Sequence, residues 1–130
     1  MILQTTLSLA AAAAIINIWL MTRIGRMRIG EKVMHGDGGN PLLLKRMRAQ
    51  ANFIEHAPLF LVLVAAIELT GRGGTWLAGV GSIFMLARVT HGFGMDSDKP
   101  NVLRAGGIMI TMLAEIGLAV MAVLIALGRF

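Results

Sequence analysis

Four long apolar runs, separated by short polar connections, constrain this chain more than any other feature. We expect them to form helices at about residues 1–22, 47–70, 75–95 and 102–127. At about 1.5 Å of rise per residue, a helix of about 20 residues crosses a hydrocarbon core of roughly 30 Å. Inside that core every backbone amide needs an internal partner, which a helix supplies. The sequence therefore predicts an all-α integral membrane protein, a four-helix bundle forming one domain over residues 1–130.

The composition supports this class and excludes several others. Hydrophobic residues make up 56% of the chain and charged residues 15%, whereas about a quarter of a soluble domain is charged. Because there is no cysteine, disulfides and thiolate sites are excluded, and any thiol chemistry needs a thiol on the ligand. The three histidines form no metal-ligand spacing, so we expect no metal site. A net charge of +5 in a membrane protein reports orientation, and we expect no nucleic-acid partner.

The first apolar run has to be distinguished from a cleaved signal peptide. A signal peptide begins with a basic region, and no Lys or Arg precedes Arg23. We therefore expect the run to be a retained transmembrane helix.

A basic loop with a sharp turn is expected between the first and second runs. It reads "TRIGRMRIGEKVMHGDGGNPLLLKRMR", and its centre, Gly36 to Pro41, has turn composition, with Pro41 expected to end regular structure before the next helix. Loops rich in Lys and Arg stay in the cytoplasm. We therefore expect the first and third loops on the cytoplasmic side and both termini on the other.

Polar side chains inside the spans are the candidates for function, because at membrane depth they normally face a bundle interior or a wet cavity. In "RMRAQANFIEHAPLFLVLVAAIEL", Arg48, Asn52 and Glu55 follow the spacing i, i+4, i+7 and share one helix face. His56 lies beside that face. The predicted topology places further polar groups at the same depth, near the cytoplasmic interface: Arg23, Arg26, Arg28, Arg88, His91 and Arg104.

This set of side chains suits a small anionic peptide that carries a thiol. Guanidinium groups hold carboxylates through paired hydrogen bonds, and a carboxylate suits an ammonium group. An arginine beside a thiol favours the thiolate. Glutathione has two carboxylates, one amine and one thiol, and so matches the set.

The segment "RMRAQANFIEHAPLFL" resembles the helix-2 signature of the MAPEG family, membrane-associated proteins in eicosanoid and glutathione metabolism. The signature is roughly Arg-Ala-x-x-Asn-x-x-Glu followed by an aromatic residue and a proline, and it is filled by Arg48, Ala49, Asn52, Glu55 and Pro58. "GDGG" in the first loop and "ARVTHGFG" resemble the bacterial branch. Arg104 falls where family enzymes carry the arginine thought to stabilise the glutathione thiolate. The resemblance covers essentially the whole chain.

The resemblance implies a microsomal glutathione transferase-like protein in a bacterial inner membrane. Its protomers would form a homotrimer, with glutathione bound between adjacent protomers near the cytoplasmic face and a lipophilic co-substrate entering from the bilayer lipids. The implied activity is that of a glutathione-dependent transferase or peroxidase acting on hydrophobic electrophiles. Carried over residue by residue, Arg104 is the catalytic residue, and glutathione binding falls to Arg26, Arg48, Asn52, Glu55, His56 and His91.

Two departures from the family pattern leave other functions open. His56 stands where many members have a tyrosine, and Met95 stands where catalytic eukaryotic members have a tyrosine that contacts glutathione. This chain has no tyrosine at all. One alternative is a non-catalytic lipid-binding or glutathione-binding membrane protein of the same fold. Another is a small proton-coupled transporter, in which Glu115 would carry the proton.

Structural roles compete with these functional ones. Arg48, Asn52 and Glu55 could form an ion-pair network that only fixes helix packing. For Arg88 we expect a structural pairing with Glu55 or Glu115.

Overall fold

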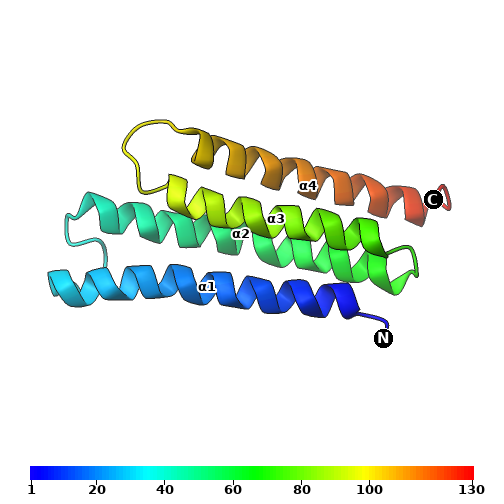
Figure 1. The fold of residues 1–130 in the computed structure, drawn as a ribbon, viewed down its shortest axis with the longest axis horizontal. Helices are drawn as coiled ribbons and strands as arrows, with labels where there is room; N and C mark the ends of the chain where they lie inside the picture. The colour runs from blue at the N-terminus through cyan, green and yellow to red at the C-terminus, as the bar shows by residue number, and fades with distance from the viewer.

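The computed structural model describes all 130 residues and contains helices and no strand. The helices are α1 (Gln4–Glu31), α2 (Pro41–Leu69), α3 (Thr75–Gly94) and α4 (Val102–Ala126). Each helix runs opposite to the one before it, so both termini lie at the same end of the molecule (Figure 1). The predicted all-α, four-helix class is confirmed.

The four helices do not form a closed ring. α2 and α3 contact each other and form the centre, α1 packs on both of them from one side, and α4 packs on both from the other. α1 and α4 do not contact one another, and Figure 1 shows them on opposite sides of the central pair. Residues that meet between α2, α3 and α4 therefore form a site separate from the groove between α1 and α2.

The connection between α1 and α2 is shorter than the sequence predicted. α1 continues nine residues beyond the expected end at residue 22 and stops at Glu31, where Lys32 adopts a left-handed conformation (φ 54°). α2 begins at Pro41 instead of residue 47. The expectation that Pro41 ends regular structure was wrong, because a proline at the first helical position loses no hydrogen bond.

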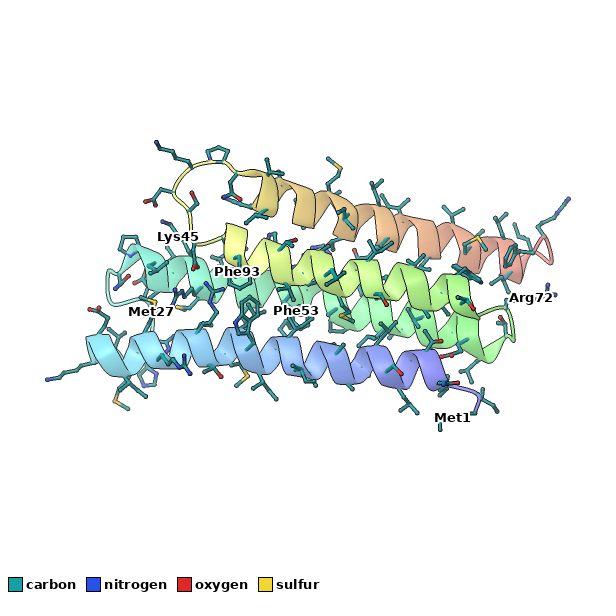
Figure 2. The ribbon with its side chains drawn as sticks, in the orientation of Figure 1. Met1, Met27, Lys45, Phe53, Arg72 and Phe93 are labelled. Atoms are coloured by element: carbon teal, nitrogen blue, oxygen red, sulfur yellow. The ribbon has the colours of Figure 1, made fainter.

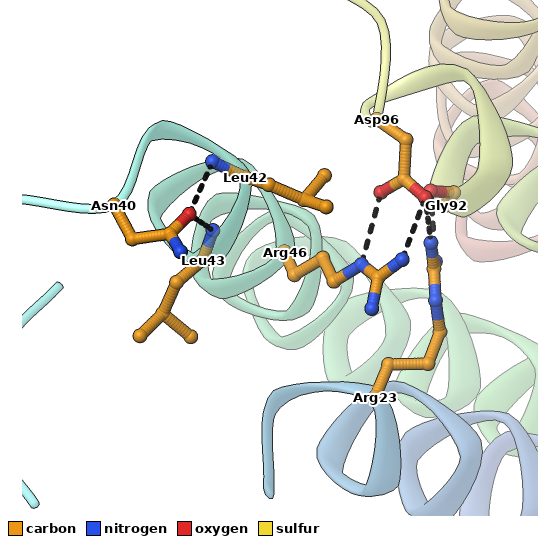
Figure 3. A network of polar contacts seen from close by, with 7 residues as sticks. All are labelled: Arg23, Asn40, Leu42, Leu43, Arg46, Gly92 and Asp96. Atoms are coloured by element: carbon orange, nitrogen blue, oxygen red, sulfur yellow. Dashed lines mark hydrogen bonds and ion pairs between the residues drawn. The ribbon is translucent and has the colours of Figure 1, made fainter. Parts of the chain in front are cut away.

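Asn40 explains where α2 begins. Its side-chain oxygen accepts the backbone N–H groups of Leu42 and Leu43 at 3.0 and 3.1 Å (Figure 3). These groups have no partner within the helix, so the asparagine caps it. Most of the predicted basic loop, including Arg26, Arg28 and Arg46, is therefore helical.

Three of the helices, α1, α2 and α4, are long and apolar enough to cross a membrane. α3 is not among these three helices; it has 20 residues and carries Arg88 and His91. Both side chains are turned inward, with exposed fractions of 1% and 4%. The expected fourth span is thus a helix whose polar residues face its neighbours.

The core holds α2 and α3 together through aromatic packing. Phe60 and Phe84 are completely buried and stack with ring centroids 3.7 Å apart. The side of α4 that faces away from the core exposes many large apolar side chains, among them Met109, Leu113, Ile116, Val120 and Val123. A large exposed apolar surface of this kind suits contact with lipid.

Two glycines let α3 and α4 approach closely at the end where α4 begins. A Cβ atom on Gly107 would lie 2.8 Å from the carbonyl oxygen of Ala87 and 2.7 Å from the Cβ of His91. A Cβ on Gly94 would clash with the backbone of Arg104. Because only glycine fits here, the first turns of α4 lie directly against the end of α3.

Ion pairs hold the helices together at this same end, which we call the basic end. Asp96, in the connection between α3 and α4, pairs with Arg23 of α1 and with Arg46 of α2 (Figure 3). Arg23 also donates to the carbonyl oxygen of Gly92 at 3.1 Å. Lys45, labelled in Figure 2 at the end opposite Arg72, pairs with Asp98.

Candidate functional site

A cavity of about 280 Å³ opens at the basic end between α2, α3 and α4. Each helix contributes two side chains one turn apart, because residues at i and i+4 share a face. The lining residues are Arg48 and Asn52 from α2, His91 and Met95 from the end of α3, and Arg104 and Ile108 from α4.

The start of α4 places Arg104 at the cavity. Asn101 caps this helix by accepting the backbone N–H of Arg104 at 2.9 Å. Arg104 therefore lies in the first turn, where the helix dipole adds partial positive charge. Its guanidinium and the N-terminus of α4 act together in favouring an anion.

The lining of the cavity is cationic and has no carboxylate. Arg48 and Arg104 take part in none of the ion pairs of the structure. Two guanidiniums without counter-charges leave their donors available for a ligand that carries carboxylate or thiolate groups.

Arg88 lies behind the cavity, and its partners differ from those expected. It donates to Asn52 Oδ1 and to Thr111 Oγ1, the latter at 3.1 Å, and lies 3.5 Å from His91 Nδ1. The expected direct pairing with Glu55 or Glu115 is absent from the structure. Neutral oxygen acceptors from α2 and α4 contact the buried guanidinium instead.

The cavity brings together four of the seven predicted site residues: Arg48, Asn52, His91 and Arg104. Glu55 instead lines a groove between α1 and α2. The Nδ1 of His56 pairs with the Oε2 of Glu115 at 3.0 Å. Arg26 is exposed on α1, a helix that contributes nothing to the cavity lining.

The groove between α1 and α2 has a volume of about 760 Å³ and contains polar residues that the sequence did not place in the binding site. Arg28 and Gln50 line it together with Glu55. The basic run "RIGRMR" could not show which of its arginines faces α2, because that depends on how α1 is rotated. Thr111 was also missed, although a hydroxyl inside an apolar run was an available signal.

His56 and Glu115 form the one ion pair in the apolar middle of the helices, joining α2 to α4. The second carboxylate oxygen of Glu115 has no hydrogen-bond partner. The only acidic residue in the middle of α4 is therefore already engaged with a histidine.

The family of this chain follows from a comparison with known proteins. The model of the MAPEG family matches residues 6–124, which include every residue of the cavity. This chain belongs to the MAPEG family. Two curated relatives are the inner membrane proteins YecN of Escherichia coli strains K12 and O6:H1 (CFT073), each 30% identical over 86 residues. The match spans 65% of this chain and 65% of each relative, just under two thirds.

The family and the fold agree on where the protein is found. Three helices of this MAPEG chain have the length and composition of membrane spans, and its YecN relatives are named as inner membrane proteins. This MAPEG protein is therefore an integral membrane protein, and the cavity opens near one end of its bundle.

Proposed function

We propose that this protein is a glutathione-dependent transferase or peroxidase that acts on hydrophobic electrophiles. The observation that supports this function is the cavity at the basic end. Arg48 and Arg104 enter it from different helices without counter-charges, beside Asn52 and His91. A thiol peptide supplies the carboxylates that such guanidiniums bind.

Arg104 is the proposed catalytic residue. Its guanidinium, together with the N-terminus of α4, favours the thiolate form of the bound thiol, which is the nucleophile. In the transferase reaction the thiolate attacks the electrophilic carbon of the substrate. A C–S bond forms, and the leaving group departs with its electron pair. The protein contributes positioning and charge stabilisation, and needs no covalent intermediate of its own.

The proposed assembly is a homotrimer with its basic end in the cytoplasm. Glu55 and Arg28 lie in the groove between α1 and α2, and Arg26 is exposed on α1. In a trimer, these side chains are the ones available to complete a neighbour's cavity. Glu55 would take the ammonium group of glutathione, and an arginine of α1 a second carboxylate. Chemical cross-linking of the purified protein in detergent tests the trimer.

The test of the function is a titration of the purified protein with glutathione, followed by thiolate absorbance. Turnover of an activated aryl halide is then measured on the same sample. We expect saturable thiolate formation and conjugate formation in the wild type, both dependent on Arg104. Absence of thiolate at saturating glutathione contradicts the proposed mechanism.

A non-catalytic binding protein is the second candidate, and Met95 favours it. This thioether lines the cavity where a tyrosine hydroxyl would donate a hydrogen bond. Loss of that donor weakens the hold on the reacting sulfur. Saturable glutathione binding without conjugate formation from several electrophiles would establish this second function instead.

A further inference from the structure

Arg88 is buried directly behind the cavity and reaches three helices. Its guanidinium donates to Asn52 on α2 and to Thr111 on α4, and faces His91 on its own helix α3. The residue is 1% exposed and does not line the cavity. Asn52 and His91 do line it, so Arg88 can act on a ligand only through these neighbours.

We propose that Arg88 is a positioning residue that makes the cavity specific for anions. A guanidinium has five N–H donors and no acceptor, so every atom that faces it has to be an acceptor. Asn52 therefore presents its carbonyl oxygen to Arg88, and its NH₂ group is directed elsewhere. This inference rests on the proposed function, because it names the charge of the group that the cavity holds.

The same argument decides the tautomer of His91. Its Nδ1 atom lies 3.5 Å from a guanidinium nitrogen of Arg88, and this position requires a lone pair on Nδ1. In the neutral ring the proton is therefore on Nε2. The Nε2–H group is then the donor that His91 can offer to a ligand.

With both orientations decided, the polar groups offered to the cavity are all donors. They are the guanidiniums of Arg48 and Arg104, the NH₂ group of Asn52 and the Nε2–H group of His91. Arg88 adds a positive charge behind them and forms no ion pair of its own. An anion in the cavity adds negative charge beside this buried guanidinium, which favours its binding.

The ligand group in this cavity is therefore a thiolate or a carboxylate, and an ammonium group is excluded from it. For a thiol peptide, the amine has to lie outside the cavity. In the proposed trimer, Glu55 of a neighbouring protomer, which lines the groove between α1 and α2, is the acid available to receive it.

The first experiment reads the tautomer of His91 by nitrogen NMR. The full chain is labelled with ¹⁵N-histidine and reconstituted in lipid nanodiscs, and the His91 signals are identified by their loss in His91→Gln. We expect Nδ1 without a proton and Nε2 with one. A proton on Nδ1 overturns the proposal.

The second experiment titrates the same sample with sodium sulfate at constant ionic strength. We expect saturable movement of the His91 Nε2 signal in the wild type. In Arg88→Lys the affinity should fall by about tenfold or more, because a compact ammonium group lacks the planar fork that directs donors to both Asn52 and His91, the two partners that line the cavity. Thr111→Val is the control: it removes a partner of Arg88 that does not line the cavity, and sulfate affinity should stay at the wild-type value.

Equal sulfate affinity in the wild type and Arg88→Lys, or no response of the wild type, overturns the proposal. If Arg88→Lys does not fold, the tautomer of His91 in the wild-type protein tests the proposal by itself. The two proposals also fail separately. If His91 has the expected tautomer and the cavity binds sulfate but glutathione does not bind, only the proposed function is refuted. Glutathione turnover with His91 protonated on Nδ1 refutes only the positioning role.

Discussion

Glu68 of α2 holds the start of α1 through Thr6, whose backbone N–H and hydroxyl group donate to its carboxylate at 2.8 and 2.7 Å. The N–H of Thr5 donates to the other carboxylate oxygen at 2.8 Å. Leu3, at the capping position of α1, offers no side-chain acceptor. A distant helix thus supplies the acceptor that a capping residue normally provides.

Replacing Glu68 should loosen the start of α1. In Glu68→Ala the first N–H groups lose their acceptor and the helix dipole loses its counter-charge, so the free energy of unfolding should fall by about 1–2 kcal/mol. Thermal unfolding in detergent measures it. Glu31→Ala, the same change at the exposed end of α1, is the control and should cost little. Equal losses in both variants contradict the capping role.

Removing the charge of Asp96 should weaken the contacts between helices at the basic end. Asp96 joins Arg23 and Arg46 and has a side-chain exposed fraction of 30%. Since partly exposed ion pairs contribute little, we expect Asp96→Asn to lower the free energy of unfolding by about 1 kcal/mol, and less at high salt. In the control Asp98→Asn, the carboxylate is 85% exposed and should change nothing measurable. A similar effect of both changes would show that the ion pairs of Asp96 do not stabilise the basic end.

Gly107→Ala should separate α3 from α4 at the cavity. The added Cβ meets the backbone oxygen of Ala87 at 2.8 Å, so the helices must shift, at an expected cost of about 1–3 kcal/mol. Glutathione affinity should fall as well, because Arg104 moves with α4. Gly106→Ala is the control, since nothing lies within 4 Å of the added atom, and it should be neutral or stabilising. If Gly107→Ala changes neither stability nor glutathione affinity, the close contact between α3 and α4 at this position is not required.

Arg104→Ser should reduce turnover far more than it reduces glutathione binding. The thiolate loses the guanidinium proposed to stabilise it, and a loss of about 10²-fold or more in turnover is expected from removing such charge stabilisation. Turnover and thiolate absorbance are measured on the same samples. Arg129→Ser, near the opposite end of α4, is the matched control and should behave as the wild type. A parallel loss of binding and turnover means that Arg104 only binds the ligand.

His56→Gln should affect stability and leave ligand affinity unchanged. His56 is engaged with Glu115 at 3.0 Å and lies outside the cavity lining. Removing one partner leaves a poorly solvated carboxylate, so the midpoint of thermal unfolding should drop. Asn52→Ala, a change within the cavity, should instead weaken glutathione binding. If His56→Gln weakens binding as much as Asn52→Ala does, His56 belongs to the binding site after all.

Local sequence signals predicted the helices well and their ends poorly. Four apolar runs predicted four helices, since length and hydropathy are properties of the chain itself. The basic segment around Arg26 and Arg28 was predicted as a loop because charge was taken as a sign of a connection. Arg and Lys are nevertheless good helix formers. The ends were decided by the left-handed Lys32 and by the Asn40 cap.

The membership of the candidate site was only partly readable from the sequence. Spacing showed that Arg48, Asn52 and Glu55 share one side of a helix. That side is wide enough to face two cavities, and Glu55 turned out to line the groove with α1. The rotation of α2 against its neighbours makes this choice, and no local pattern encodes that rotation.

By itself, the sequence determined the all-helical class, the membrane environment and the types of polar side chain that enter the spans, because apolar length and composition depend only on the chain. Tertiary structure alone decided which of those side chains meet. Helices α3 and α4 approach at Gly94 and Gly107, which places Arg104 beside His91 and leaves Arg88 buried behind them. The physical reason is that close packing selects one rotation and depth for each helix, and a shift of one turn would bring different side chains together.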